Sequence, residues 1–460
     1  MEPLAWYGLG KAYLGRFQED RFMNSNRQAV DRFLHDHDMH PEAVSIDETV
    51  RHMTEEMEQG LAGQPSSLAM IPTYIDTERS VPVGEKAVVL DAGGTNLRAA
   101  LVSFQEDGSP IIEDFSKRPM PGTQGTVVGK EEFFSSLAAL VEPLASRANT
   151  VGFCFSYPTE ILPNRDGRLI HWSKEIQAPE VEGCLVGAQL QNALVERGIK
   201  EVPPVTVLND TVATLLTGKA ASVGRDWGAY VGFILGTGTN TCYVESNDSI
   251  AKAQGLASGG QQVINCESGS FACRHRGTAD VMLGETTSKP ETYWLEKMLS
   301  GGYFGALATQ VMKLAGDKGL LSLPLKEQLA RFGEISTKDA DNYTHNPQGT
   351  NNDLVSLLQS SGSNADAERT WFLMDALLER AARLTAANLA APVLKGQSGK
   401  GPLAPACLTV DGTTYYRYYR FESRVEALLR PYLAERDHYY ETVRVEDAPL
   451  IGAAVAALTN

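Results

Sequence analysis

The segment Asp91–Asn96 reads Asp-Ala-Gly-Gly-Thr-Asn and combines a carboxylate, two glycines, a hydroxyl and an amide. Glycines let the backbone approach a ligand closely, and successive N–H groups with the Thr95 hydroxyl can donate to phosphate oxygens. A carboxylate beside phosphates also suits a Mg²⁺ ion held mostly through water. An ordinary hairpin that starts with aspartate is the alternative. Neither the Gly-x-x-x-x-Gly-Lys-Ser/Thr phosphate loop nor the Gly-x-Gly-x-x-Gly dinucleotide pattern is present.

A second segment, Gly236–Asn240, reads Gly-Thr-Gly-Thr-Asn and offers the same kinds of donor. Like the first segment, it lies between two apolar runs, which suggests two related α/β halves that each begin with a hairpin. Two turns of this kind imply a nucleotide held in a cleft between the halves. Hairpin turns often contain these residues, so the repeated pattern by itself is suggestive only.

Asp210 is a candidate acid or base because it follows the apolar run Val205–Leu208 and precedes a predicted helix that starts at Thr211. In α/β folds, ligands bind at the carboxyl ends of the strands. The same position also suits the N-cap of the following helix. Taken alone, the local sequence favours the cap over a catalytic carboxylate.

Hydrophobic periodicity predicts the elements that must position these segments. Residues 1–62 are expected to be mainly helical, and residues 334–366 are polar and expected to be rich in loops. The other predicted strands and helices are these: strands at 86–104, 151–155, 205–208, 230–235 and 408–411, and helices at 133–144, 184–196, 370–395 and 450–458.

The whole chain has 460 residues, of which 43% are hydrophobic, and this allows large cores in two to four domains. A formal net charge of −16 argues against a general nucleic-acid binder. No apolar run reaches the ~18 residues of a membrane span, and no signal peptide is visible, so a cytoplasmic enzyme is expected. The cysteines are scattered, which argues against a disulfide scaffold. The sequence leaves open whether the protein is a monomer or a homodimer.

Taken in order along the chain, these segments resemble the motifs of the eukaryotic-type hexokinase and glucokinase family, in a single catalytic unit. The resemblance runs from about residue 55 to residue 458 and covers nearly the whole chain. The matching segments are Ser66–Tyr74, Leu90–Arg98, Gly152–Pro158, Leu208–Thr214, Gly236–Tyr243, Ile264–Phe271, Leu295–Met298, Val410–Gly412 and Gly452–Ala454.

The resemblance implies an α/β fold of the two-lobed, actin-like (ribonuclease H-like) type. The small lobe would comprise residues 67–208 with the final helix, 446–460, and the large lobe residues 1–66 and 209–445. A hexose, most simply glucose, and MgATP would meet in the cleft. The implied reaction gives ADP and hexose 6-phosphate, the first step of glycolysis.

The roles implied by the resemblance fall into three groups. Asp210 would be the base for the sugar 6-hydroxyl, and Lys174 would offset charge on the transferred phosphoryl group. The sugar would be held by Ser156, Ser173, Lys174, Asn209, Asp210, Asn240, Glu267 and Glu296. The nucleotide would be surrounded by Asp91, Gly93, Gly94, Thr95, Asn96, Arg98, Gly236, Thr237 and Gly412, with Asp91 holding Mg²⁺ through water.

The sequence departs from the family pattern at several positions. Ser173 stands where the family usually has threonine, and Tyr157 stands where it usually has phenylalanine. The segment between Phe271 and Lys289 is short and contains Arg-His-Arg at 274–276. Residues 289–293 lack the two glutamines common before the second glutamate, which leaves strict glucose preference open. A sugar sensor without catalysis, a kinase for mannose or an amino sugar, and a polyphosphate or pyrophosphate donor remain alternatives.

Overall fold

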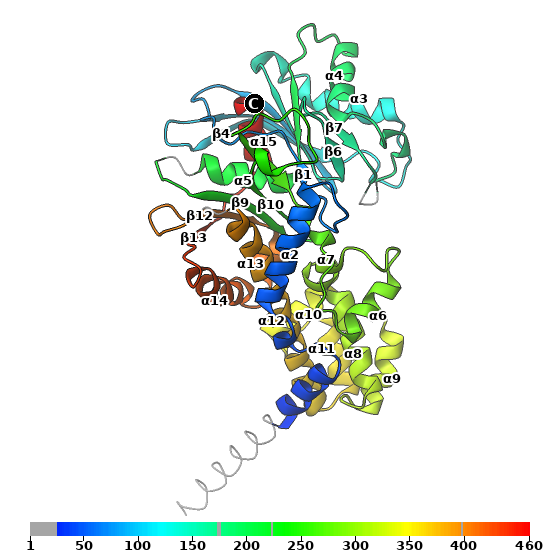
Figure 1. The fold of residues 1–460 in the computed structure, drawn as a ribbon. Coiled ribbons are helices and arrows are strands. Elements are labelled where there is room, and N and C mark those ends of the chain that lie inside the picture. The colour runs from blue at the N-terminus through cyan, green and yellow to red at the C-terminus, as the bar shows by residue number, and fades with distance from the viewer. Residues whose placement is uncertain (1–24, 173–175, 222–223, 397–398) are drawn as a thin grey trace, which may run out of the picture.

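The computed structural model describes residues 25–172, 176–221, 224–396 and 399–460. Ser173 and Lys174, two of the predicted site residues, therefore lie outside the described residues, as does the first part of the predicted N-terminal helical region. Within the described part, two mixed sheets form the framework, and helices lie between them and on their outer faces (Figure 1).

The smaller framework sheet has five strands in the order β4-β3-β2-β5-β8. The strands β4, β3 and β2 are antiparallel, while β2, β5 and β8 run parallel. Every residue of β2 is buried, as expected for a central strand with an unbroken apolar run. The strand bounds are Ala87–Ala92 for β2, Asn96–Phe104 for β3, Pro110–Pro119 for β4, Val151–Phe155 for β5 and Val205–Leu208 for β8.

The second sheet has six strands in the order β1-β11-β10-β9-β12-β13. Apart from the short strand β1, it repeats the first sheet: three antiparallel strands are followed by two parallel ones. The predicted relation between two α/β halves is confirmed, because both hairpins occupy equivalent positions in sheets of the same topology. The bounds are Ile71–Pro72 for β1, Ala229–Leu235 for β9, Thr239–Ser246 for β10, Gln261–Asn265 for β11, Ala406–Asp411 for β12 and Tyr440–Val443 for β13.

Two helices, α5 (Asp210–Ala220) and α15 (Ala448–Thr459), pack against each other and contact opposite sheets. Helix α15 contacts β2, β5 and β8, while α5 contacts β9, β10 and β12. Their close approach depends on Gly452, where an added Cβ would lie 1.9 Å from the Ala213 carbonyl oxygen. The two helices and the facing sheet residues share one apolar core.

The remaining helices cover the outer faces. Helices α3 and α4 contact each other beside the five-stranded sheet, at one end of the molecule in Figure 1, and α6, α8 and α9 lie at the other end. A helix over residues 25–36 and the following elements complete the fold: α2 Ile46–Leu61, α3 Lys130–Val141, β6 Thr159–Ile161, β7 Gly167–Leu169, α4 Val186–Glu196, α6 Thr278–Thr286, α7 Trp294–Leu299, α8 Phe304–Asp317, α9 Leu323–Phe332, α10 Thr337–His345, α11 Asp353–Ser361, α12 Asn364–Lys395, α13 Thr413–Arg417 and α14 Phe421–Ala434. None of the described helices is long and apolar enough to cross a membrane.

The prediction of a loop-rich stretch at residues 334–366 was wrong, because α10, α11 and the start of α12 lie there. Helix α10 is short and polar, whereas α11 is short and buries four apolar side chains. The side chains of Ser336 and Asn352 cap the N-termini of α10 and α11 by accepting hydrogen bonds from backbone N–H groups. Ser363 and Asp366 form a capping box that starts α12 six residues before its predicted beginning.

Candidate active site

Asp210 is the first residue of α5 and directly follows Asn209, which comes after the end of β8. The N-cap of α5 is Asn209, whose side-chain oxygen accepts from the Thr211 N–H at 2.8 Å. The Asp210 carboxylate also accepts from this N–H, at 2.9 Å. The expected cap at Asp210 is therefore wrong by one residue. Asn209 is thus the N-cap, and Asp210 adds a second acceptor for the same N–H from the first turn of the helix.

A chain of side-chain amides leads from Asn209 to a second carboxylate. The Asn240 amide nitrogen lies 3.5 Å from the Asn209 side-chain oxygen, 2.8 Å from that of Asn265 and 3.4 Å from Glu267 Oε1. Asn265 donates to the same Glu267 oxygen at 2.7 Å. These residues come from the start of α5, from β10 and from the end of β11, which lie in different parts of the sequence. The structure thus brings together Asn209, Asn240 and Glu267 as the sequence analysis expected.

Glu267 has a left-handed backbone conformation, with φ 56° and ψ 47°, which is costly for a residue with a Cβ. The pKa of Glu267 is raised to about 7, mainly by burial and also by the negative charges of Asp210 and Glu296, against the opposing effect of the hydrogen bonds from Asn265 and Asn240. The three carboxylates therefore lie close enough to interact. A partly buried group of this kind is suited to accept hydrogen bonds from a neutral, hydroxyl-rich ligand.

Glu296, on α7, accepts a hydrogen bond from the Thr239 backbone N–H at 3.1 Å. Glycines make room for this carboxylate, because an added Cβ at Gly238 would lie 2.6 Å from Glu296 Oε2 and one at Gly269 would lie 3.2 Å away. The second turn is thus connected directly to the carboxylate cluster.

The first turn connects β2 to β3. Asp91 and Arg98 face each other across these strands, and the Arg98 Nε lies 3.1 Å from the buried Asp91 Oδ2. The turn is closed by a hydrogen bond from the Gly93 N–H to the Asn96 carbonyl at 3.1 Å. The other predicted residues of the turn are positioned as follows: Gly94 and Asn96 are half-buried, Thr95 is exposed, and the Asn96 side chain donates to the Thr95 hydroxyl at 2.9 Å.

The second turn is held by the segment after α7 and by the start of α13. The carbonyl oxygen of Gly236 accepts from the Gly301 N–H at 2.8 Å and from the Thr414 hydroxyl at 2.9 Å. The exposed Thr237 accepts through its carbonyl from the Gly302 N–H, at 2.8 Å. Gly412 packs beside this turn with φ 107°, and an added Cβ would lie 2.2 Å from the Leu235 carbonyl oxygen.

The charge of Asp210 reaches groups on both sides of the site. Burial raises the pKa of Cys154, and the charges of Asp91 and Asp210 raise it further. Burial likewise raises the pKa of Asp411 at the end of β12, and Asp210 adds to this effect while Arg98 opposes it. Asp210 is therefore near the first turn and near the segment that contains Gly412, as well as near the glutamates.

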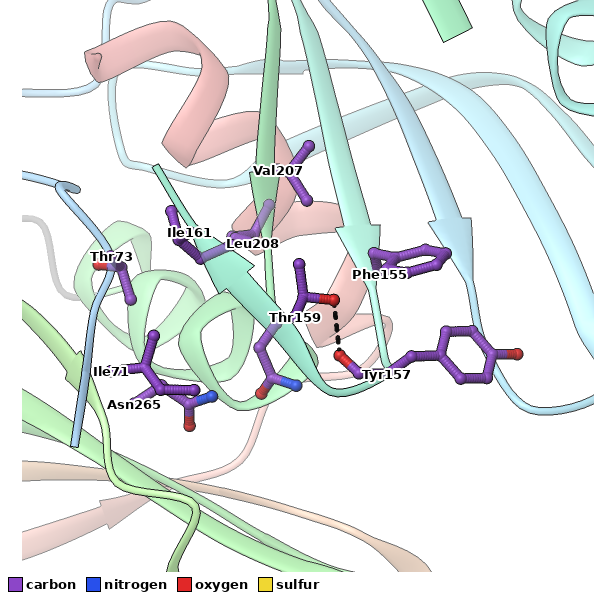
Figure 2. A pocket seen from close by; sticks show the side chains of 10 residues that line it. Ile71, Thr73, Phe155, Tyr157, Thr159, Ile161, Val207, Leu208 and Asn265 are labelled. Carbon is purple, nitrogen blue, oxygen red and sulfur yellow. Dashed lines mark hydrogen bonds between the residues drawn. The ribbon is translucent and has the colours of Figure 1, made fainter. Parts of the chain in front are cut away.

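Ser156 follows β5, and its backbone N–H donates to the Ala92 carbonyl at 3.3 Å. Next to it, a small, mainly apolar pocket lies where the two sheets meet, with Asn209 and Asn265 at its polar side. Figure 2 shows Ile71, Thr73 and Asn265 on one side of this pocket and Val207, Leu208 and Phe155 on the other. The pocket thus places the Asn209 and Asn265 side chains beside an apolar junction between the sheets.

The side chains near the first turn offer a Mg²⁺ ion few direct ligands. The described residues contain no cluster of three or more His, Cys, Asp or Glu side chains that could hold a metal ion. Asp91 is buried and paired with Arg98. This arrangement suits an ion bound mainly to phosphate oxygens and water, with Asp91 acting through water.

Sequence reasoning missed Asn265, the Tyr157 hydroxyl and Asp411. Asn265 lies two residues before Glu267, a spacing that could have indicated a shared face at the end of a strand. The Tyr157 hydroxyl donates to the Gly93 carbonyl at 2.5 Å, a contact across 64 residues that no local pattern predicts. Asp411 directly precedes the predicted Gly412, at the end of β12, and hydrophobic periodicity gives no signal for such a residue.

Two family models, both described as Hexokinase, match consecutive parts of the chain, at residues 29–220 and 230–459. Hexokinase-1 from Oryza sativa subsp. japonica is 31% identical over 454 residues, which cover 91% of this chain and 88% of that protein. Hexokinase-3 from Mus musculus is 30% identical over 396 residues, which cover 82% of this chain and 42% of that protein. The chain thus spans less than half the length of this mammalian relative.

Among solved structures, a hexokinase from Schistosoma mansoni in complex with glucose has a TM-score of 0.74 to this chain, at 24% sequence identity. The alignment covers 95% of this chain and 100% of that one. The prediction of a two-lobed, actin-like α/β fold is confirmed by this likeness together with the two sheets of repeated topology.

Proposed function

The chain belongs to the hexokinase family, and from this premise we propose that it transfers the γ-phosphoryl group of MgATP to the 6-hydroxyl of a D-hexose. The products are ADP and hexose 6-phosphate, and the hydroxyl proton passes to Asp210. The observation that carries this proposal is the cluster in which Asn209, Asn240, Asn265 and Glu267 form a hydrogen-bonded series that begins beside Asp210.

Asp210 acts as the general base. Its carboxylate lies in the first turn of α5, at the end of the helix where the backbone N–H groups are. One carboxylate oxygen is fixed by the Thr211 N–H, which orients the group without consuming its other oxygen. Because the attacking hydroxyl has a much higher pKa than a carboxyl, proton transfer is late, and positioning contributes most of the rate enhancement.

The amides and glutamates bind the other sugar hydroxyls. Asn209 and Asn240 offer both donors and acceptors, while Glu267 and Glu296 accept two hydrogen bonds each in fixed directions. Such a set discriminates between sugars that differ in the orientation of one hydroxyl, because a misplaced hydroxyl leaves a buried polar group without its partner. Glucose is the proposed substrate, with Ser156 and Ser173 contributing hydroxyls from the small lobe.

The two turns bind the nucleotide phosphates. Backbone N–H groups that the turns do not use themselves serve as donors together with the Thr95 and Thr237 hydroxyls, and Arg98 adds positive charge beside Asp91. Gly412, whose missing side chain lets it pack against Leu235 beside the second turn, is assigned to the adenosine side of the nucleotide. A bound Mg²⁺ would neutralise phosphate charge, with Asp91 holding it through water, and Lys174 would offset charge that develops on the transferred group.

We further propose that residues 67–208 with 446–460 form the small lobe and that residues 1–66 and 209–445 form the large lobe. The contacts of α15 with β2 and β5 support the assignment of the C-terminal helix to the small lobe. Sugar binding would bring the lobes together and exclude water from the transferred phosphoryl group, which limits ATP hydrolysis. We place this activity in the cytoplasm at the first step of glycolysis.

A coupled assay of the purified chain across sugars and donors tests the proposal. Glucose, mannose, fructose and glucosamine are each combined with ATP, polyphosphate or pyrophosphate, with and without Mg²⁺. We expect ADP and hexose 6-phosphate from glucose, ATP and Mg²⁺, and loss of turnover when EDTA removes the metal. Glucose binding without any sugar phosphate would support a sensor instead, and a strong preference for another sugar would replace glucose as the substrate.

A further inference from the structure

A second polar cavity of about 250 Å³ lies outside the proposed active site, between α2 and the segment that follows Phe271. The side chains that could bind a ligand there are those of Arg51 and His52 on α2 and of Arg274 and His275 on the facing segment. A cavity of this size holds several water molecules, and it therefore has room for a small polar ligand.

Three of the four basic groups at the cavity, Arg51, His52 and His275, have a carboxylate within 4 Å. Arg51 is paired with Glu55 at 3.7 Å, and His275 lies 3.7 Å from Glu48, which is itself exposed. Within the part of the chain that the structure describes, Arg274 forms no ion pair, although it lines the cavity. A guanidinium has five N–H donors in a planar fork, a geometry that matches phosphate oxygens.

His52 forms a buried wall of the cavity, and only 7% of its surface is exposed. Burial lowers the pKa of His52 and the positive charge of Arg274 lowers it further, while Glu56, 3.6 Å from the His52 Nε2, opposes this shift. The field of Arg274 therefore reaches the interior of the cavity, whose polar groups are mostly donors. A ligand that accepts hydrogen bonds and carries negative charge is the chemical complement of such a lining.

We propose that this cavity is a second binding site, for a small anion of the phosphate class, such as inorganic phosphate or the phosphate group of a small monoester. Arg274 is its principal ligand. Arg51, His52 and His275 provide further donors. Glu48 lies at the edge and is exposed to solvent, and a large anion that covered it would be disfavoured.

The cavity is connected to both glutamates of the proposed active site. The rings of His52 and Phe271 lie 4.9 Å apart, and the Phe271 carbonyl accepts from the Leu295 N–H at 3.3 Å, one residue before Glu296. In the other direction, Phe271 ends the short turn that begins after Glu267. An anion that orders the Phe271 segment would therefore change hexose affinity. This consequence rests on the proposed function, whereas the binding site does not.

Direct binding tests the site. Titration calorimetry with inorganic phosphate, in the presence of saturating MgADP and glucose, compares the wild type with Arg274→Ala and with Arg276→Ala. Arg276 is the matched control because it has the same charge but pairs with Glu291 and stacks on Trp294 at 4.6 Å. We expect roughly tenfold weaker phosphate binding for Arg274→Ala and little change for Arg276→Ala, in line with the loss of one charge-assisted contact.

Phosphate affinity that is the same in Arg274→Ala as in the wild type would overturn the proposal, as would an absence of binding to the wild type. A parallel titration with glucose 6-phosphate distinguishes the two sources of the anion, because tighter binding of the ester assigns the site to a phosphate monoester. The glucose Kd is then measured with and without phosphate. An Arg274-dependent change confirms the coupling, and phosphate binding without such a change removes the coupling alone.

Discussion

The hydroxyl of Tyr157 donates a hydrogen bond to the main-chain carbonyl of Gly93, with 2.5 Å between the two oxygens. This contact joins the segment after β5 to the first glycine turn. The ring is buried and packs edge-on against Trp172, with ring centres 4.7 Å apart. The family usually has phenylalanine at this position, so the contact is a feature of this chain that links the proposed sugar segment to the proposed phosphate turn.

Tyr157→Phe should raise the KM for ATP several-fold and change glucose binding little, because the turn loses one fixed point while the aromatic packing stays. Loss of the hydrogen bond should also cost about 1 kcal/mol of stability. Steady-state kinetics and thermal unfolding measure the two effects. Tyr343→Phe is the matched control, since its hydroxyl donates to the Ala367 carbonyl at 2.6 Å away from the proposed site. Equal KM values for ATP in the two variants would contradict the proposal that Tyr157 positions the first turn.

Glucose binding should weaken as the pH falls below 7. The pKa of Glu267 is about 7, raised mainly by burial, and its ionised form is the better acceptor for sugar hydroxyls. One pH unit below this pKa, about a tenth of the carboxyl is ionised, so affinity should fall roughly tenfold between pH 8 and pH 6. Glu267→Gln should bind glucose weakly with no such dependence. A pH-independent Kd in the wild type would contradict this role of Glu267.

The same group should make the free protein less stable at alkaline pH. A carboxyl with a raised folded-state pKa stabilises the protein below the unfolded-state pKa, near 4.5, and this contribution is lost as the pH rises through 7. The loss amounts to up to about 3 kcal/mol. The stability of Glu267→Gln relative to the wild type should therefore be greater at pH 8 than at pH 5. Urea unfolding of both proteins at the two pH values measures this difference. An identical pH dependence in both proteins would argue against the raised pKa.

Gly452→Ala should destabilise the protein by about 2–4 kcal/mol, because its Cβ would collide with the Ala213 carbonyl where α15 crosses α5. Gly129→Ala is the control, since its Cβ would make an ordinary contact of 3.5 Å with the Glu180 side chain. Thermal unfolding of both variants measures the difference. A Tm for Gly452→Ala equal to that of the control would mean that the two helices can separate without cost.

The order of elements and much of the site could be predicted from the sequence, because apolar runs and glycine turns are local signals. Strands β5 and β8 were predicted with their observed bounds. Helix α10 was missed because it has few apolar residues, and α11 because it is short, although it contains the apolar residues Leu354, Val355, Leu357 and Leu358; their caps at Ser336 and Asn352 resemble loop residues. Contacts such as Asn265 with Asn240 depend on the pairing of β10 with β11, which local pattern cannot specify.

The cap of α5 illustrates a further limit. A sequence with Asn and Asp in succession predicts that one of them caps the helix, but it does not say which. The structure assigns the cap to Asn209 and leaves Asp210 in the first turn, next to the glutamates. The proposal that Asp210 is the base comes from family resemblance rather than from local chemistry.

The most direct measurement is the turnover of Asp210→Asn and Asp210→Ala with glucose and MgATP, together with the glucose Kd of each. The asparagine variant keeps an acceptor for the Thr211 N–H but loses the carboxylate. A loss of turnover in this variant therefore reflects the missing base and not a lost hydrogen bond at the start of the helix. We predict a fall in kcat of about 10²-fold or more in both variants, with glucose binding largely kept. Near-normal turnover in Asp210→Asn would contradict the assignment of Asp210 as the base.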